Sequence, residues 1–315
     1  MSQSRPRTLI IGLGSIGQRH ADLLADLGAE VAACTRRRDA GLPSYTGLEQ
    51  ALRESAPERV VIANPTAEHV GTLLRLHELG FSGDVLVEKP LFSQIPETPL
   101  PASFRQSVAV GYNLRFHPAV RALREALQAE EPVSAHLYVG QYLPTWRPGR
   151  DYRKSYSASV AQGGGVLRDL SHELDLGLWL FGPWQRLIAH GGHLSELEIE
   201  TEDTVGLLWQ ARHCPKVAVE INYLDRAPRR NILVHTRRHT WEADMLGCRL
   251  LRDGEPVQSW TTIRNATYQA QDRAWLDGQR DTLCSFDEGL AVLHMIESIE
   301  ASLRRCAWVD APSPP

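Results

Sequence analysis

Short apolar runs alternate with longer amphipathic stretches in the first third of the chain. Four of these runs predict buried strands, at residues 8–11, 29–33, 60–63 and 85–87. The stretches 16–27 and 67–79 carry apolar residues at helical spacing and predict helices between the strands. Strands that alternate with helices predict a doubly wound parallel sheet, in which ligands bind at the carboxyl ends of the strands.

The pattern changes after Gly111. Helices are predicted at 117–128 and 166–180, and an irregular stretch rich in Pro, Arg and aromatic residues lies between them at 141–165. A strand is predicted at 133–139, and several strands with alternating apolar and polar residues are predicted within 187–260. The last predicted elements are helices at 265–276 and 286–303. We therefore expect an α/β domain over residues 1–111 and an α+β domain with a large open mixed or antiparallel sheet over residues 112–315.

The composition is that of an ordinary folded protein, with 43% hydrophobic and 23% charged residues. The formal net charge of -4 gives no general attraction to nucleic acid or to anionic lipid, and no apolar run reaches the ~20 residues that span a bilayer. The five cysteines are scattered and form no CxxC pair, which argues against a disulfide framework and against a structural metal site. These features predict a cytoplasmic protein that binds small molecules, with no metal.

A glycine-rich turn connects the first predicted strand to the first predicted helix. Its glycines allow a tight turn and a close approach of pyrophosphate to the backbone, and the helix N-terminus favours the anion. In this position the motif predicts a Rossmann dinucleotide-binding domain. The cofactor-binding residues predicted here are Gly12, Gly14, Ser15, Ile16 and Gly17.

The end of the second predicted strand lacks the acidic residue that usually binds the ribose 2′-hydroxyl of NAD. Thr35 and the cluster Arg36 to Arg38 stand there instead, and the first acid is Asp39. Guanidinium groups are matched to phosphate oxygens, so Thr35, Arg36 and Arg37 predict NADP as the preferred cofactor, with NAD as a possibility. The alternative is a solvated Arg cluster in an Arg-rich protein.

Two further segments follow strand ends and are expected to line the cofactor site. The first contains Asn64, Pro65, Thr66 and His69, of which His69 is interpreted as a lining or capping residue rather than a catalyst. The second contains Glu88 and Lys89. Lys89 is one of only three lysines in the chain, and its ammonium is suited to proton chemistry; a surface lysine is the alternative interpretation.

A glycine turn at 163–165 leads into the predicted helix that carries Asp169 and His172. These two residues are three apart, which places them on one face of a continuous helix. A carboxylate beside an imidazole fixes its tautomer and raises its basicity, as proton transfer requires. Spacing alone favours a helix-surface pair without function.

Taken together, these motifs resemble the Gfo/Idh/MocA family of sugar oxidoreductases. The resemblance rests on the glycine-rich turn, the segments 64–69, 88–90 and 111–116, the turn at 163–165 with its helix, and the segment 287–290. It implies Lys89, Asp169 and His172 as catalytic residues that also contact substrate, adds Asn113 and Arg115 to the cofactor site, and makes Arg115 a substrate ligand as well. The family usually has three residues between the Asp and the His, whereas only Leu170 and Ser171 stand between them here.

Aromatic and cationic residues gather in the segment 141–157. Aromatic faces pack on sugar C–H surfaces, and Arg side chains bind phosphate or carboxylate. We therefore expect substrate contacts from Trp146, Arg147, Tyr152 and Tyr156, although a merely structural loop anchored by the Trp is the alternative.

These observations predict an NAD(P)-dependent oxidoreductase that transfers hydride between nicotinamide and a hydroxyl or carbonyl carbon of a sugar or nucleotide sugar. Two alternatives stay open: a glycosidase that uses NAD for transient oxidation, and a non-catalytic dinucleotide-sensing regulator. The resemblance also implies a homodimer or homotetramer formed through the C-terminal sheet.

Overall fold

A computed structural model of the chain describes residues 5–37, 39–97, 99–261 and 263–312. The chain divides into two compact units. The first contains residues up to Phe116 together with Asn265–Leu293, and the second contains His117–Arg264 together with the residues from His294 onward. A single division near Gly111 does not capture this arrangement, because the segment 265–293 returns to the first unit.

The first unit is built on a seven-stranded sheet in the order β15-β6-β5-β4-β1-β2-β3. All neighbouring strands are parallel except β15, which pairs antiparallel with β6. The predicted doubly wound parallel sheet is thus confirmed. The strands are β1 (Arg7–Ile11), β2 (Glu30–Cys34), β3 (Ser44–Tyr45), β4 (Arg59–Ile62), β5 (Asp84–Val87), β6 (Val108–Val110) and β15 (Cys284–Ser285).

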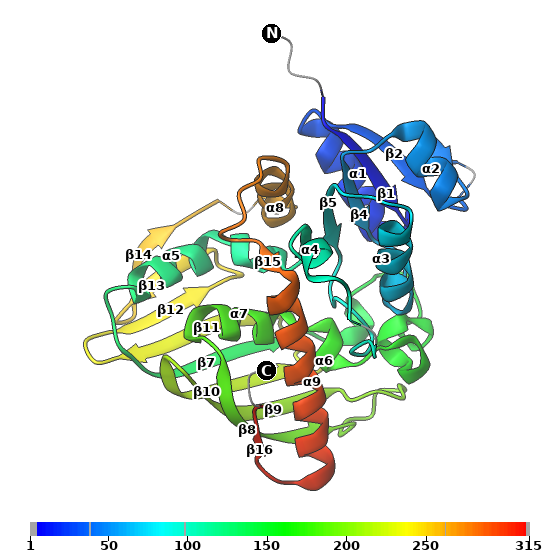
Figure 1. Ribbon diagram of the computed structural model, residues 1–315. Coiled ribbons are helices and arrows are strands. Elements are labelled where there is room, and N and C mark those ends of the chain that lie inside the picture. Colours follow the sequence, from blue (N-terminus) through cyan, green and yellow to red (C-terminus); the bar gives the residue numbers. More distant parts are fainter. Residues whose placement is uncertain (1–4, 38, 98, 262, 313–315) are drawn as a thin grey trace. The chain divides into compact units, whose positions relative to one another are not determined.

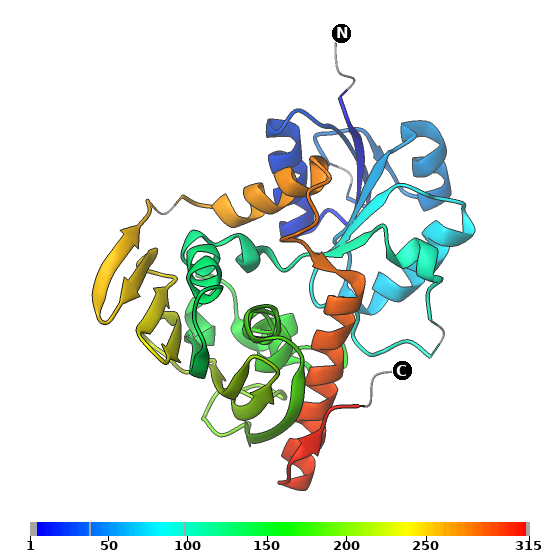
Figure 2. The same ribbon diagram turned by 60° about the vertical axis from the view of Figure 1, so that its left-hand side comes forward.

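Helices pack around this sheet through apolar side chains. Ile10, Val61 and Leu86 from three adjacent strands share one core with Leu24 of α1 and Trp275 of α8, and each such side chain stabilises the unit by about 1.5–3 kcal/mol when fully buried. Helix α8 lies beside α1 although it comes from near the other end of the chain (Figure 2). The helical segments are α1 (Ser15–Asp26), α2 (Leu48–Ser55), η1 (Thr66–Glu68), α3 (His69–Glu78), α4 (Ala102–Arg105), η2 (Asn113–Phe116) and α8 (Ala266–Leu276).

The second unit contains a nine-stranded sheet in the order β14-β13-β12-β11-β7-β10-β9-β8-β16. Strands β7 and β10 are parallel and the other neighbours are antiparallel, so the sheet is mixed, as predicted. The strands are β7 (Pro132–Gly140), β8 (Trp184–Gly192), β9 (Thr204–Ala211), β10 (Cys214–Asn222), β11 (Arg229–Thr236), β12 (Thr240–Asp244), β13 (Arg249–Arg252), β14 (Glu255–Ser259) and β16 (Val309–Asp310).

The side chains of this sheet alternate between a covered face and an open face. Val205, Leu207 and Trp209 of β9 are buried, whereas Leu208 between them is 41% exposed. Helices α5 (Pro118–Leu127) and α7 (His172–Phe181) pack on the sheet (Figure 1). The remaining helical segments of this unit are η3 (Leu143–Thr145), η4 (Tyr152–Lys154), η5 (Tyr156–Ala158), η6 (Val160–Gln162) and α6 (Val166–Asp169), while α9 (Phe286–Arg305) begins in the first unit and ends in the second.

The continuous helix predicted over 166–180 is wrong, because α6 ends at Asp169 and α7 begins at His172. Leu170 leaves helical geometry with φ −101° and ψ 25°. The Ser171 hydroxyl donates a hydrogen bond to the Arg168 carbonyl at 3.0 Å, a local bond of the kind that competes with a regular helix. The argument that Asp169 and His172 share one face of a continuous helix therefore does not hold.

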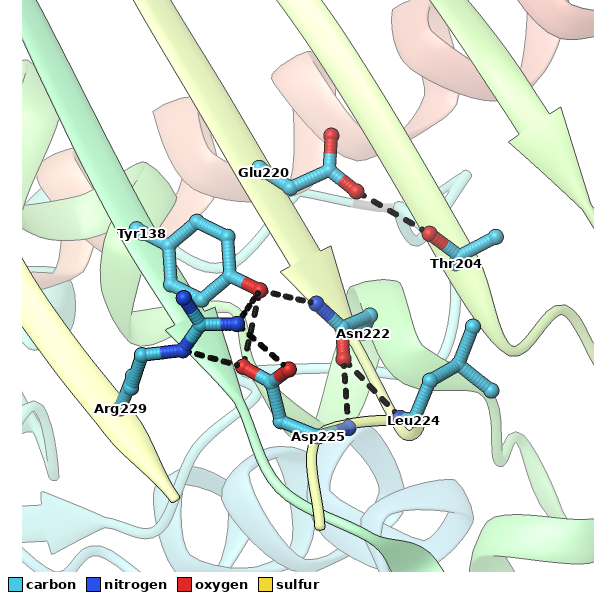
Figure 3. A network of polar contacts seen from close by, with 7 residues as sticks. All are labelled: Tyr138, Thr204, Glu220, Asn222, Leu224, Asp225 and Arg229. Atoms are coloured by element: carbon cyan, nitrogen blue, oxygen red, sulfur yellow. Dashed lines mark hydrogen bonds and ion pairs between the residues drawn. The ribbon is translucent and has the colours of Figure 1, made fainter. Parts of the chain in front are cut away.

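A polar network fixes the turn between β10 and β11 (Figure 3). The Tyr138 hydroxyl donates to Asp225 Oδ2 at 2.8 Å, and Asn222 Nδ2 donates to the Tyr138 oxygen at 3.1 Å. Arg229 binds both carboxylate oxygens of Asp225, at 2.8 and 3.1 Å. The Asn222 side-chain oxygen also accepts the Leu224 and Asp225 backbone N–H groups, at 2.9 and 3.1 Å, so the network holds the backbone of this turn.

In the part of the chain that the structure describes, none of the helices is both long enough and apolar enough to cross a bilayer.

Candidate functional site

The glycine-rich turn connects β1 to α1 with very little space around two of its glycines. Gly12 has φ +90°, and a Cβ atom there would lie 2.6 Å from backbone atoms of Asn64. A Cβ on Gly17 would lie 2.0 Å from the Gly12 carbonyl oxygen. Around Gly14, the N-cap of α1, a Cβ would meet no described atom within 4 Å. The turn is therefore held by packing at both ends and leaves its middle open to a ligand.

The start of α1 is suited to an anion. Ser15 and Ile16 open the helix, and the N–H groups of a first helical turn have no partner within the helix. These groups and the helix dipole give the turn a positive electrostatic character. The arrangement fits the pyrophosphate of a dinucleotide.

His69 connects the segments that follow β4 and β5. Its ring is 1% exposed, with Nδ1 3.0 Å from the Leu91 carbonyl oxygen and Nε2 3.1 Å from the Asn64 carbonyl oxygen. Burial lowers the pKa of His69, which keeps the ring neutral near pH 7. The neighbouring Asn64 amide donates to Thr72 Oγ1 at 2.9 Å, and Pro65 and Thr66 form the start of η1. These contacts favour a role for His69 in holding the loop.

The two described arginines after β2, Arg36 and Arg37, are accessible. Thr35 is half-buried and its Oγ1 accepts the Arg37 N–H at 3.1 Å, while the side chains of Arg36 and Arg37 are exposed. Arg37 reaches Gln18 Oε1 of α1 at 3.3 Å. Arg38 lies outside the described residues. Thr35 and Arg37 thus lie on the α1 side of the β2 end.

Glu88 and Lys89 follow β5. The structure adds His20 and Asp272 to this group, two residues that were not predicted from the sequence. Glu88 Oε1 lies 2.9 Å from Nε2 of His20, and Nδ1 of that ring contacts Asp272. The Lys89 N–H donates to Glu88 Oε2 at 3.3 Å, and the Lys89 residue is half-buried. No local pattern relates His20 to Asp272, which is 252 residues away.

Asn113 and Arg115 are buried within the first unit. The Asn113 amide donates to Thr267 Oγ1 at 2.7 Å. Arg115 is 1% exposed and donates to Glu288 Oε1 at 3.1 Å and to the Leu283 carbonyl oxygen at 3.4 Å. Both residues tie η2 to the returning segment 265–293, which favours a structural role for them.

Asp169, at the end of α6, is bound by two tyrosines of the second unit. The Tyr223 hydroxyl donates to Asp169 Oδ2 at 2.7 Å, and Tyr156 also hydrogen-bonds to Asp169. Burial, followed by the negative charge of Asp169, raises the pKa of Tyr156 and of Tyr223 well above the usual range. Both hydroxyls therefore stay protonated and act as donors to the carboxylate.

His172 opens α7 and is 8% exposed. The next residue, Glu173, accepts a forked pair of hydrogen bonds from Arg230 of β11, at 2.7 and 3.0 Å. Paired charge-assisted bonds of this type are strong and directional. They fix the first turn of α7, and with it the backbone position of His172.

The segment 141–157 forms a pocket of about 360 Å³, within the range of small-molecule sites. Its lining combines aromatic and cationic side chains and includes all four predicted residues of this segment. The pocket residues with such side chains are Trp146, Arg147, Arg150, Tyr152, Lys154 and Tyr156. The Trp146 ring packs edge-on against Tyr223 at 5.1 Å. Tyr156 and Tyr223 thus link the pocket to Asp169.

The predicted residues therefore form two groups. Gly12 to Gly17, Thr35 to Arg37, Asn64 to His69 and Glu88 to Lys89 belong to the first unit. Asp169, His172 and the loop pocket belong to the second. Among the described residues, no cluster of three or more His, Cys, Asp or Glu side chains is arranged to hold a metal ion.

Two family models match the sequence. Residues 6–99 match an oxidoreductase family with an NAD-binding Rossmann fold, and residues 119–242 match the GFO/IDH/MocA C-terminal domain. Together the two matches span more than half of the chain and cover both units.

Two curated proteins are similar over part of their length. An uncharacterized oxidoreductase from Synechocystis is 30% identical over 152 residues, which is 47% of this chain and 40% of that protein. Inositol 2-dehydrogenase from Corynebacterium glutamicum is 26% identical over 193 residues, which is 56% of this chain and 54% of that protein. The chain thus matches about half the length of these relatives.

Among solved structures, the WlbA dehydrogenase from Bordetella pertussis, determined with NADH and UDP-GlcNAcA, has the same fold. Its TM-score is 0.77 at 19% sequence identity, over 100% of both chains.

Proposed function

Because this chain belongs to the Gfo/Idh/MocA oxidoreductase family, we propose that it is an NAD(P)-dependent oxidoreductase. Its substrate is a sugar or nucleotide sugar that reacts at a hydroxyl or carbonyl carbon. The observation that carries the proposal is the glycine-rich turn, which is closely packed at Gly12 and Gly17 and open at Gly14. A dinucleotide fits there with its pyrophosphate on the first turn of α1, and Asn64 to Thr66 and Lys89 complete this side of the site.

The bound nicotinamide supplies or accepts a hydride at its C4 carbon. A substrate hydroxyl must lose its proton when its carbon loses hydride, so the protein needs an acid/base group. Lys89 donates a hydrogen bond to the reacting oxygen and stabilises its developing negative charge. His172 moves the proton, while Asp169 orients the substrate from its position between Tyr156 and Tyr223.

NADP is the preferred cofactor. Thr35 and the exposed side chains of Arg36 and Arg37 follow β2, where an NAD-specific enzyme has an acid. The Arg37 backbone is held by Thr35, and its side chain reaches toward Gln18 of α1. Two guanidinium groups there match a 2′-phosphate in charge and geometry.

The loop pocket binds the sugar derivative. Its aromatic residues Trp146, Tyr152 and Tyr156 offer faces for sugar C–H groups, and Arg147, Arg150 and Lys154 offer positive charge. This combination favours a substrate with a phosphate, carboxylate or diphosphate group. The similarity to an inositol dehydrogenase and to a dehydrogenase crystallised with a nucleotide sugar supports this substrate class.

A homodimer or homotetramer forms through the open face of the second sheet. Strand register places Ile188, Leu208, Ala218 and Leu233 in one row across β8, β9, β10 and β11, interrupted by His136 of β7. Leu208 is 41% exposed, and the other three apolar residues are partly exposed. An apolar row on an uncovered sheet face is suited to contact with a second copy.

The test is a substrate screen with the purified chain. NADP or NAD is mixed with sugars, uronic acids, sugar phosphates and nucleotide sugars, and the absorbance of reduced nicotinamide is followed together with product mass. We expect one substrate class to reduce the nicotinamide stoichiometrically with turnover. Hydrolysis without net reduction would instead identify a glycosidase, and cofactor binding without any turnover would identify a dinucleotide sensor.

A further inference from the structure

A histidine in the first unit lies between two carboxylates with no access to solvent. His20 of α1 is 0% exposed. Its Nδ1 lies 2.9 and 3.0 Å from the two carboxylate oxygens of Asp272, and its Nε2 lies 2.9 Å from Glu88 Oε1. Asp272 itself is also 0% exposed. The three side chains form a continuous chain from α8 through α1 to the end of β5.

The hydrogen-bonding capacity of these three side chains determines how many protons they share. An ionised carboxylate only accepts hydrogen bonds, and a neutral imidazole has a single N–H. Both ring contacts are hydrogen bonds only when the ring is an imidazolium, or when one carboxyl group carries the second proton. Burial by itself lowers the pKa of His20, but Asp272 and Glu88 outweigh that effect and raise it to about 10. The imidazolium form is therefore favoured.

The other groups near the His20 ring are compatible with a positive charge on that ring. The Tyr268 ring meets His20 edge-on at 5.8 Å, and the Arg19 guanidinium lies 4.8 Å from the Tyr268 centroid. Burial raises the pKa of Tyr268, so its hydroxyl stays neutral. The charges in direct contact with His20 are thus those of Asp272 and Glu88, with Arg19 behind the tyrosine.

The Glu88 carboxylate connects His20 to the backbone of Lys89. Its Oε2 accepts the Lys89 backbone N–H at 3.3 Å, while Oε1 binds His20. A Cβ atom on Gly111 would lie 2.8 Å from Glu88 Oε1, so the glycine leaves the space that the carboxylate occupies. The Glu88 carboxylate is held by His20 on one side and holds the Lys89 backbone on the other.

We propose that His20 and Asp272 are positioning residues for Lys89, acting through the Glu88 carboxylate. This inference rests on the proposed function, in which Lys89 binds the reacting oxygen. The returning segment 265–293 therefore completes the support of this side of the site. Asp272 keeps the ring doubly protonated, the ring fixes Glu88, and Glu88 fixes the backbone from which the Lys89 side chain extends.

The first test measures the protonation state of the His20 ring directly and does not depend on enzyme activity. In protein labelled with ¹⁵N-histidine, at about pH 8, above the ordinary imidazole pKa of ~6.5, we expect both nitrogens of His20 to be protonated. The assignment comes from the loss of the signals in His20→Gln. In Asp272→Asn we expect one ring proton to be lost, whereas Asp272→Glu retains both. A singly protonated ring in the wild-type protein would overturn the proposal.

The second test asks whether the chain of contacts reaches Lys89. We expect the backbone amide signal of Lys89 to shift in Asp272→Asn and in Glu88→Gln. Asp277→Asn, which changes an exposed carboxylate just after α8, is the matched control and should leave that signal in place. An unmoved Lys89 signal in both test variants would overturn the proposal whether or not the protein turns over a sugar.

The third test is kinetic and uses the substrate found by the screen. Misplacing a catalytic group by about 1 Å costs up to ~10²-fold in rate. We expect kcat to fall about 10- to 100-fold in Asp272→Asn, with little change in cofactor affinity and with recovery in Asp272→Glu. Normal kcat in Asp272→Asn, with a wild-type enzyme that is active, would refute the positioning role and leave the proposed function intact.

Discussion

The Tyr223 hydroxyl donates a hydrogen bond to Asp169 Oδ2 at 2.7 Å. This contact joins the residue that follows β10 to the last residue of α6, at the point where the predicted helix is broken. Tyr223 is 0% exposed and packs edge-on against Trp146 of the loop pocket. The carboxylate is thus oriented by the sheet and the pocket wall together.

Removing the Tyr223 hydroxyl should weaken this arrangement. A hydrogen bond to a charged group contributes about 1.5–3 kcal/mol, so Tyr223→Phe should lower the free energy of unfolding by about that amount and reduce kcat/KM. Denaturant titration and kinetics measure the two effects. Tyr138→Phe, which removes a hydroxyl bound to Asp225 in the same sheet (Figure 3), should affect stability alone. Equal kinetics in both variants would contradict the assignment of Asp169 to the substrate site.

Lys89→Met should reduce kcat by about 10²-fold or more, because it removes a charge that stabilises the reacting oxygen while keeping much of the side-chain volume. Cofactor affinity, measured by titration, should change little. The exposed Lys216 of β10 provides the matched control Lys216→Met, for which we expect wild-type turnover. Normal turnover of Lys89→Met would leave the lysine as a surface or cofactor-packing residue.

His172→Asn should lower kcat by about 10²–10⁴-fold if the imidazole moves the proton. The limb of the pH–rate profile that belongs to an imidazole should also disappear. His213→Asn, which changes an exposed histidine, should retain the wild-type kcat and the imidazole limb of the pH–rate profile. If His172→Asn retained that limb and Lys89→Met abolished it, the lysine would be the base and His172 would position the substrate.

NADP should bind more tightly than NAD by about ten- to over a hundred-fold, since charge-assisted hydrogen bonds contribute about 1.5–3 kcal/mol. Arg36→Ala and Arg37→Ala should reduce that preference, as measured by titration of both cofactors. Arg53→Ala, on the exposed side of α2, tests for a general charge effect and should preserve the preference. Equal affinities in the wild-type protein would show that the arginine cluster is only solvated.

Leu208→Lys should convert the proposed oligomer to monomers, because it places a charge within the apolar row on the open sheet face. Sedimentation equilibrium of the wild type and the variant measures the change. Val160→Lys, at a position that is 63% exposed and outside the sheet, should keep the wild-type mass. A monomeric wild-type protein would refute the proposed interface.

Much of the fold follows from local sequence pattern. The alternation of buried runs with amphipathic stretches predicted β1, α1, β2, β4, α3 and β5, because a parallel sheet buries its strands on both faces and gives a strong hydrophobic signal. The short elements β3, α4 and β15 were not predicted. They contain between two and four residues, too few for a periodicity to appear.

The candidate residues at strand ends could also be predicted from the sequence, because the carboxyl ends of parallel strands meet at one edge of the sheet. Gly12, Asn64 and Lys89 each follow a strand that its own composition predicted. In the same way, the aromatic and cationic composition of the segment 141–157 marked the residues that line one pocket.

Only the tertiary structure revealed the partners of these residues. The pairing of His20 with Asp272 spans 252 positions, and that of Tyr223 with Asp169 spans 54. Spacing rules describe neighbours within one helix or strand, whereas such contacts depend on how separate elements pack. The sequence by itself determined many of the longer elements and where chemistry is available, and long-range packing decided which side chains act together.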